Sequence, residues 1–79
     1  MKLPRDLSGA ELVEILCRRW NYRQIHQEGS HILIETLEPF PQRISVPAHR
    51  TLRLGTLHSI LRSVARHKGI DRNEILHRS

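Results

Sequence analysis

Two segments with strand-like sequences, residues 22–27 and 30–37, are separated only by Glu28 and Gly29. A two-residue connection that contains glycine is typical of a β-hairpin. Parallel strands cannot be joined in this way, because they need a crossover of a dozen or more residues. The sequence therefore predicts an antiparallel pair of strands near the middle of the chain.

A helix is predicted before this hairpin, from Gly9 to about Trp20. Ser8 and Glu11 have the spacing of a capping box, and the apolar residues that follow recur at helical intervals. Cys17 belongs to that apolar stripe and is interpreted as a packing residue. It is the only cysteine, so no internal disulfide is expected.

A second helix is predicted after the hairpin, with Thr56 as its cap and Gly69 as its end. Its apolar residues fall at i, i+3, i+4 and i+7: Leu57, Ile60, Leu61 and Val64. Asp71 and Glu74 repeat the capping spacing, which predicts a short terminal helical turn.

A third strand is predicted at residues 42–46, after the interruption by Pro39 and Pro41. The order is then helix, three strands, helix, which indicates an α+β fold. The amphipathic stripes are buried most simply if both helices cover one face of a three-stranded antiparallel sheet. With 79 residues, the chain forms a single domain, 1–79, and the opposite face of the sheet is expected to be open.

The expected Glu28-Gly29 turn fixes a register in which His26 lies opposite His31 and Gln24 opposite Leu33. Side chains alternate between the two faces of a sheet. The helix-facing side then receives Ile25, Ile32 and Ile34. His31 is therefore predicted on the open face, beside His26 and Gln24. Leu33 and Leu37 are placed there too, and apolar residues on an open face suggest that a protein partner covers it.

The chain is basic, with 13 Lys and Arg against 8 Asp and Glu and a formal charge of +5. Eleven of the cations are arginine, which binds phosphate in a bidentate manner better than lysine does. Anionic partners are therefore favoured. The predicted phosphate contacts lie in or near the open side: Arg43, Arg50 and Arg53. Three other cations are interpreted as a solvated helix face: Arg62, Arg66 and Lys68.

Histidine can exchange a proton near neutral pH, and nearby arginines can hold a phosphate and stabilise its developing charge. This combination suits RNA cleavage, in which the 2′-hydroxyl is an internal nucleophile. No metal-ligand spacing, glycine-rich phosphate loop or paired-carboxylate motif is present, so no metal or cofactor is expected. No apolar run approaches the ~20 residues of a membrane span, and no signal-peptide core is apparent. A cytoplasmic protein is expected.

Three stretches carry a family resemblance: Gly29-Ser30-His31, then Val46-Pro47 with His49, then Gly55-Thr56-Leu57 leading into Ile60-Leu61-Arg62. In their order and spacing, from the first helix to nearly the end, the chain resembles the HicA family of small toxins. Many relatives carry a second histidine directly after the first and an aromatic residue two positions later, whereas this chain has Ile32 and Ile34. The loop "EPFPQ" also replaces a more usual Asp-Gly type of turn. These differences bear on substrate preference and catalytic rate.

The resemblance implies a fold like that of double-stranded-RNA-binding domains. It also implies a type II toxin that acts as a metal-independent mRNA endoribonuclease, or mRNA interferase, and inhibits translation and growth. His31 would be the catalytic acid or base, and the supporting residues would be Gly29, Ser30, Gln24 and His26. The implied partners are mRNA and a HicB-like antitoxin that covers the active surface, to which Leu33 and Leu37 would contribute.

Two other functions remain open from the residues. The chain could be a non-catalytic double-stranded-RNA-binding module, although the short turn offers little reach into a groove. It could also be a protein-interaction domain whose basic face docks an acidic partner. Cleavage of RNA by the free protein would separate the toxin from both.

Overall fold

The computed structural model describes residues 6–76 and confirms the predicted α-β-β-β-α order of an α+β fold. The elements are α1 (Gly9–Arg19), β1 (Arg23–Glu28), β2 (His31–Thr36), β3 (Gln42–Pro47), α2 (Leu54–Lys68) and the 3-10 turn η1 (Arg72–Glu74). The strands form one antiparallel sheet in the order β1-β2-β3. This is the topology of double-stranded-RNA-binding domains.

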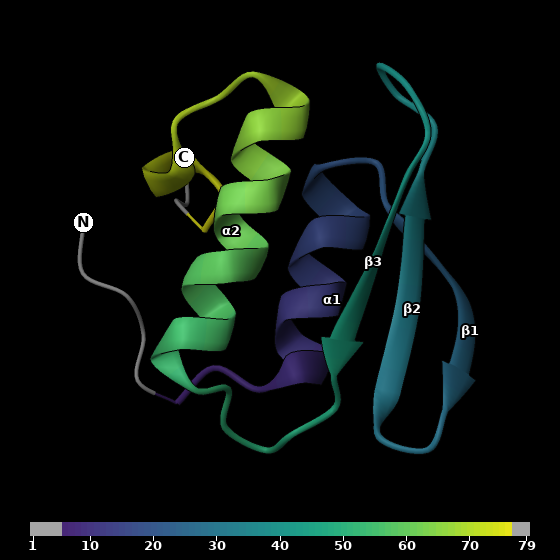
Figure 1. Ribbon diagram of the computed structural model, residues 1–79, viewed down its shortest axis with the longest axis vertical. Helices are drawn as coiled ribbons and strands as arrows, with labels where there is room; N and C mark the ends of the chain where they lie inside the picture. The colour runs from purple at the N-terminus through teal and green to yellow at the C-terminus, as the bar shows by residue number, and fades with distance from the viewer. Residues whose placement is uncertain (1–5, 77–79) are drawn as a thin grey trace.

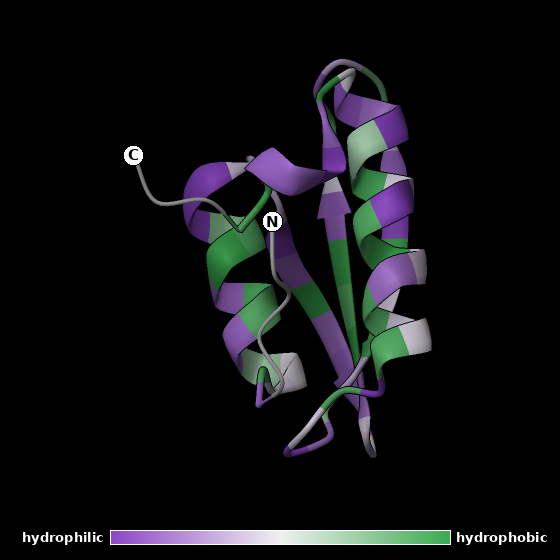
Figure 2. Cartoon of the chain, turned by 90° about the vertical axis from the view of Figure 1, so that its left-hand side faces the viewer, coloured by the Kyte–Doolittle hydropathy of each residue, from purple (hydrophilic) through white to green (hydrophobic). Residues whose placement is uncertain are grey.

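Both helices lie on one side of the sheet, as the sequence predicts (Figure 1). Figure 2 views the molecule from the helix side, where apolar and polar residues interleave along each helix. The core between the layers consists mainly of aliphatic side chains, among them Leu12, Leu16, Ile32, Ile34, Ile44, Val46, Leu57, Leu61 and Val64. The other face of the sheet is not covered by either helix (Figure 1).

The helix ends agree with the sequence except at the start of α2. Ser8 and Glu11 form the predicted capping box, and Gly69 ends α2 in the left-handed conformation with φ 68°. The side chain of Asp71 caps η1 by accepting from the backbone N–H of Asn73. The prediction of Thr56 as a cap is wrong, because the N-cap lies three residues earlier and α2 begins at Leu54.

The N-cap of α2 is Arg53, whose side chain makes no capping hydrogen bond. Tertiary contacts replace the missing cap. The backbone N–H of Leu52 donates to the carbonyl of Leu7 at 2.8 Å, and the Leu52 side chain is buried in the core. The chain is therefore held in place just before the helix by long-range contacts, which local sequence does not reveal.

The predicted register of the hairpin is wrong by two residues. The turn consists of Gly29 and Ser30, and Glu28 pairs with His31. Gly29 has φ 58° at the first central position, where a type II′ turn requires glycine. The positive φ needed there is one that glycine adopts without strain, which agrees with a Gly-Ser turn.

An irregularity interrupts the β1–β2 ladder between Gln24 and His26. Ile25 has no partner there and is only half-buried, so it does not join the core as expected. The extra residue also changes the alternation of side chains beyond it. As a result, Arg23 lies opposite Glu35, and Gln24 lies opposite the buried Ile34.

Tyr22 is buried at the end of the sheet remote from the hairpin turn, where its hydroxyl donates to the Gln42 side chain. Burial raises the pKa of Tyr22 to about 12 from the usual value of 10. The neutral phenol is therefore favoured in the folded state. Its contribution to stability is complete below pH 10 and is lost as the pH rises toward 12.

We expect the free energy of unfolding to fall between pH 10 and 12 by about 2–3 kcal/mol more in the native protein than in Tyr22→Phe. Urea denaturation at several pH values measures this difference. If the free energy of unfolding falls equally with pH in the two proteins, the pKa of the phenol is the same in the folded and unfolded states.

Candidate functional site

His31 is the first residue of the central strand, β2, and its side chain is exposed. Its neighbour Ile32 is buried against the helices, so the alternation along the strand directs His31 to the open face. The predicted exposure of His31 on this face is confirmed. Its catalytic role stays a prediction.

The corrected register brings Glu28 directly opposite His31 on β1, in place of the expected His26. His26 lies opposite Leu33 and is therefore a diagonal neighbour of His31. The Nε2 atom of His26 is 3.9 Å from Oε1 of Glu28. Glu28 is thus near His26 on the edge strand and opposite His31 on the central strand. Sequence reasoning missed Glu28 because it placed this residue in the turn, although the Gly-Ser pair was a signal for a turn one residue later.

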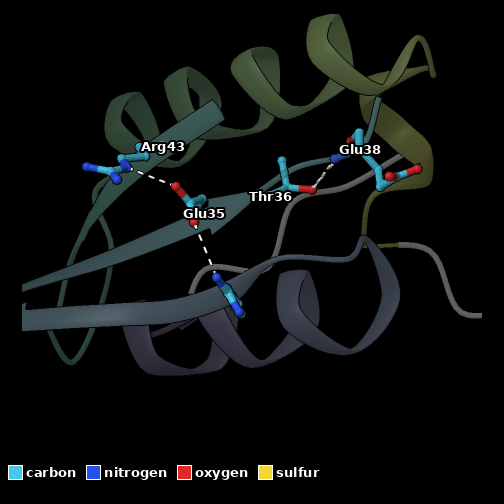
Figure 3. A network of polar contacts seen from close by, with 5 residues as sticks. Glu35, Thr36, Glu38 and Arg43 are labelled. Carbon is cyan, nitrogen blue, oxygen red and sulfur yellow. Dashed lines mark hydrogen bonds and ion pairs between the residues drawn. The ribbon is translucent and has the colours of Figure 1, made fainter. Parts of the chain in front are cut away.

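Arg43, a predicted phosphate contact, is engaged by Glu35 on the same face (Figure 3). Arg43 Nε donates to Oε2 of Glu35 at 3.0 Å, and a terminal nitrogen of Arg23 lies 3.7 Å from Oε1. The Glu35 side chain is only 14% exposed. One partly buried carboxylate is therefore shared by two exposed guanidinium groups.

The ionic side chains of the open face nearly cancel among the residues that the structure describes. The register places Arg23 and Arg43 there together with Glu28 and Glu35. The positive excess of the chain consequently lies elsewhere. Arg43 retains an exposed guanidinium, but a phosphate that approached it would also meet the field of Glu35.

A second group of predicted residues lies at the hairpin-turn end of the sheet. The segment after β3 is held against the turn, because the backbone N–H of Ala48 donates to the carbonyl of Ser30. This segment contains Arg50 and Arg53, both exposed. Gly29, Ser30, His31 and these two arginines therefore belong to the same end of the molecule.

Both helices also begin at this end (Figure 1). The N-terminus of a helix carries partial positive charge on its free N–H groups. In α1 the capping box provides a hydrogen-bond acceptor for one of these N–H groups, whereas α2 has no side-chain cap. The electrostatic environment at the hairpin-turn end thus suits an anion better than the centre of the open face does.

Gln24, a predicted supporting residue, does not share a face with His31. The irregularity in the ladder pairs it with Ile34, and its Nε2 donates to Oε1 of Gln27 at 3.5 Å. Gln27 pairs in turn with the buried Ile32. The predicted position of Gln24 is therefore wrong, and the one-residue change of alternation within β1 is the reason.

The two leucines expected on the open face are separated. Leu33 does lie there, half-buried between His26 and Ser45 on the neighbouring strands. Leu37 follows the end of β2 and is 55% exposed in the β2–β3 loop, at the opposite end of the sheet from His31. Leu33 therefore lies within the sheet, whereas Leu37 lies just beyond the end of β2, and the contribution of both to one partner surface stays a prediction.

The chemical capacity of this region is proton exchange and anion binding. His31 can accept or donate a proton, and the arginines and helix N-terminus can attract a phosphate. Residues 6–76 contain no cluster of three His, Cys, Asp or Glu that could hold a metal ion. Burial raises the pKa of the Cys17 thiol, which disfavours the nucleophilic thiolate.

Comparison of the chain with protein-family models, with curated proteins and with solved structures finds no match. The likeness to HicA toxins therefore stays an expectation based on the residues quoted above. No helix in the described part of the chain has both the length and the apolar character needed to cross a membrane.

Proposed function

We propose that this protein is a metal-independent endoribonuclease that cleaves mRNA and serves as the toxin of a type II toxin-antitoxin system in the cytoplasm. The observation that carries the proposal is the exposed imidazole of His31 at the start of the central strand. It directly follows a tight Gly-Ser turn and lies at the end of the molecule that has the positive helix N-termini. An accessible proton acceptor beside an anion-binding region is what RNA cleavage without a cofactor requires.

In the proposed reaction, His31 removes the proton from a ribose 2′-hydroxyl. The 2′-oxygen then attacks the adjacent phosphorus, and the bond from phosphorus to the 5′-oxygen of the next nucleotide breaks. A protonated group returns a proton to that leaving oxygen. The products are a 2′,3′-cyclic phosphate and a 5′-hydroxyl, so the atoms and charges balance.

The neighbours of His31 have distinct roles in this proposal. Glu28, directly opposite, stabilises the imidazolium that forms when His31 accepts the proton. His26, a diagonal neighbour near Glu28, is the candidate for the group that protonates the leaving oxygen. Arg50 and Arg53 hold the RNA backbone, and Arg43 contributes less because Glu35 already accepts its hydrogen bond.

A HicB-like antitoxin is the proposed protein partner. Leu33 supports this, because it is an apolar residue in the middle of a face that neither helix covers. Arg23, Glu28, Glu35 and Arg43 surround it with both signs of charge. An apolar centre with a polar rim is the usual anatomy of a protein–protein interface. Leu37, at the far end of the sheet, is not part of this central surface.

The topology favours one alternative, a non-catalytic double-stranded-RNA-binding module. Such modules contact about 16 base pairs through several separate regions. Here the β1–β2 connection has only Gly29 and Ser30, so it projects little beyond the sheet. The balanced charges of the open face also argue against simple docking of an acidic partner there. Cleavage of accessible single-stranded RNA is therefore better supported than non-catalytic binding of double-stranded RNA.

One assay separates the enzyme from the binding module. Purified protein is incubated with a labelled single-stranded RNA and with duplexes shorter and longer than about 16 base pairs, all in excess chelator. We expect fragments from the single strand and no length-dependent binding of the duplexes. Binding that requires the longer duplex, without fragments from either substrate, would favour the module and reject the enzyme.

A further inference from the structure

A solvent-open pocket of about 310 Å³ lies between the outer side of α2 and the β2–β3 loop. Its volume is at the lower end of the range for small-molecule sites. The lining includes Phe40 and Gln42 from the loop and β3, and Ser59, Arg62, Ser63, Arg66 and His67 from α2. The pocket lies on the helix side of the sheet, away from the open face that carries His31.

The pocket has an aromatic wall. The Phe40 ring packs against the His67 ring with centroids 4.2 Å apart and planes inclined at 59°. Nε2 of His67 lies 2.7 Å from the Phe40 carbonyl oxygen and so donates a hydrogen bond to it. The contact holds the loop against α2, while Phe40 itself remains 56% exposed. An exposed ring held from behind is a platform on which a nucleobase can stack.

His67 itself is unusual among the residues that line this pocket. It is only 7% exposed. Its Nδ1 atom is buried and has no hydrogen-bond partner among the residues that the structure describes. Nε2 must carry a proton, because the carbonyl oxygen of Phe40 can only accept. Buried polar atoms without partners are uncommon in native proteins.

The lining of the pocket also contains two cations. Arg62 and Arg66 are both exposed and are four residues apart, so they lie on the same side of α2. Two like charges at this spacing repel each other and weaken the helix by a small amount. The sequence of α2 contains no Asp or Glu, and the ion pairs formed within residues 6–76 involve neither arginine.

The helix dipole explains only part of this arrangement. Arg66 belongs to the last turn of α2, where positive charge is favourable, but Arg62 lies in the middle of the helix. A phosphate between the two guanidinium groups would remove their repulsion and form charge-assisted hydrogen bonds. The hydroxyls of Ser59 and Ser63, on the same side of the helix, are further donors to such an anion.

We propose that this pocket binds a nucleotide, with the base stacked on Phe40 and the phosphate held between Arg62 and Arg66. The sequence pattern alone assigns these arginines to a solvated helix face, whereas the structure joins them to an aromatic platform in one pocket. The same chemistry would recognise a free nucleotide or one unit of a single-stranded nucleic acid. Binding at this position does not require His31.

The test is a titration of isotopically labelled protein, followed by nuclear magnetic resonance, with adenosine monophosphate, adenosine and inorganic phosphate. We expect saturable shifts for Phe40 and for residues 59–67 with the nucleotide, and weaker binding of adenosine and of phosphate alone. The double substitution Arg62→Gln/Arg66→Gln should weaken nucleotide binding about tenfold or more. Phe40→Ala should weaken it about fivefold or more.

The matched control is Arg18→Gln/Arg19→Gln, which removes two exposed arginines from the last turn of α1. This variant has the same net charge as the pocket variant and should bind the nucleotide as the native protein does. An equal loss of nucleotide affinity in both double variants would show that the effect depends only on net charge, and would reject the proposed binding pocket. Absence of saturable shifts in the native protein would overturn it as well.

A deoxyadenosine hexamer distinguishes the two sources of the nucleotide. It has no 2′-hydroxyl, so the proposed reaction cannot cleave it. Binding more than about tenfold tighter than the mononucleotide would identify one unit of a nucleic-acid chain, whereas equal affinity would identify a free nucleotide. His31→Ala should retain this binding in full. Loss of cleavage and loss of nucleotide binding are therefore separate results, and either proposal can fail without the other.

Discussion

His31→Ala is expected to lower RNA cleavage about 100-fold or more while leaving the fold intact. Removal of a general acid or base typically costs a factor of 10² to 10⁴ in rate. The side chain is exposed and does not belong to the buried core, so the free energy of unfolding should change by less than about 0.5 kcal/mol. Cleavage is measured on a labelled single strand, and folding by circular dichroism during urea denaturation.

His31→Gln and His58→Ala are the controls. Glutamine keeps a polar side chain of similar reach but cannot exchange a proton near neutral pH, so His31→Gln should be as inactive as His31→Ala. His58 lies on α2 near Arg72, away from the open face, and its replacement should leave cleavage unchanged. Expression of the native chain, but not of the His31 variants, should arrest bacterial growth. Undiminished cleavage by His31→Ala would remove this residue from the mechanism.

Gly9→Ala is expected to destabilise the protein by about 2–3 kcal/mol or more, a large share of the stability of so small a domain. Gly9 is buried at the start of α1, where a Cβ atom would lie 1.8 Å from the carbonyl oxygen of Pro47. Because this neighbour is backbone, no side-chain rotation relieves the overlap. The backbone N–H of Gly9 also donates to the carbonyl of His49 at 2.9 Å.

Gly55→Ala is the matched control, because Gly55 is exposed in the first turn of α2 and a Cβ atom there meets nothing within 4 Å. Alanine favours the helix over glycine, so this variant should be unchanged or more stable by up to about 1 kcal/mol. The midpoints of urea denaturation of the two variants measure the contrast. Equal stability of Gly9→Ala and the native protein would show that α1 does not approach the end of β3 so closely.

Gly9→Ala should also affect the candidate site. Pro47, which the new methyl group would displace, pairs with His31 across the sheet. The carbonyl of Ser30 accepts from Ala48, the next residue along the chain. We therefore expect a further loss of RNA cleavage in the folded fraction of this variant. The tight packing of α1 on the end of β3 thus stabilises the fold and positions the residues around His31.

The order of elements was predictable because it depends on local patterns. The capping box of Ser8 and Glu11, and the glycine at the end of α2, each reflect interactions among residues close in the chain. The exposure of His31 was predictable for a similar reason. The error of two residues in the register preserves the parity of the faces, so His31 stays outward although its partner changes from His26 to Glu28.

Other features depend on contacts that sequence spacing does not show. The irregularity at Ile25 changes the face of Gln24, and the early end of β2 moves Leu37 into a loop. The ion pair of Arg43 with Glu35 and the pocket containing Arg62 and Arg66 arise only when separate elements pack together. In each case the position of one residue is decided by a partner distant in the chain.

The chemical ends of the RNA products provide the most direct test of the central claim, which is that an outward-facing histidine activates the 2′-hydroxyl of RNA. A short single-stranded RNA is treated with the purified protein in excess chelator, and the fragments are analysed by mass spectrometry. We expect 2′,3′-cyclic phosphate and 5′-hydroxyl ends, and no cleavage at a position where the 2′-hydroxyl is replaced by hydrogen. Fragments with 3′-hydroxyl and 5′-phosphate ends, or cleavage at the deoxy position, would contradict it.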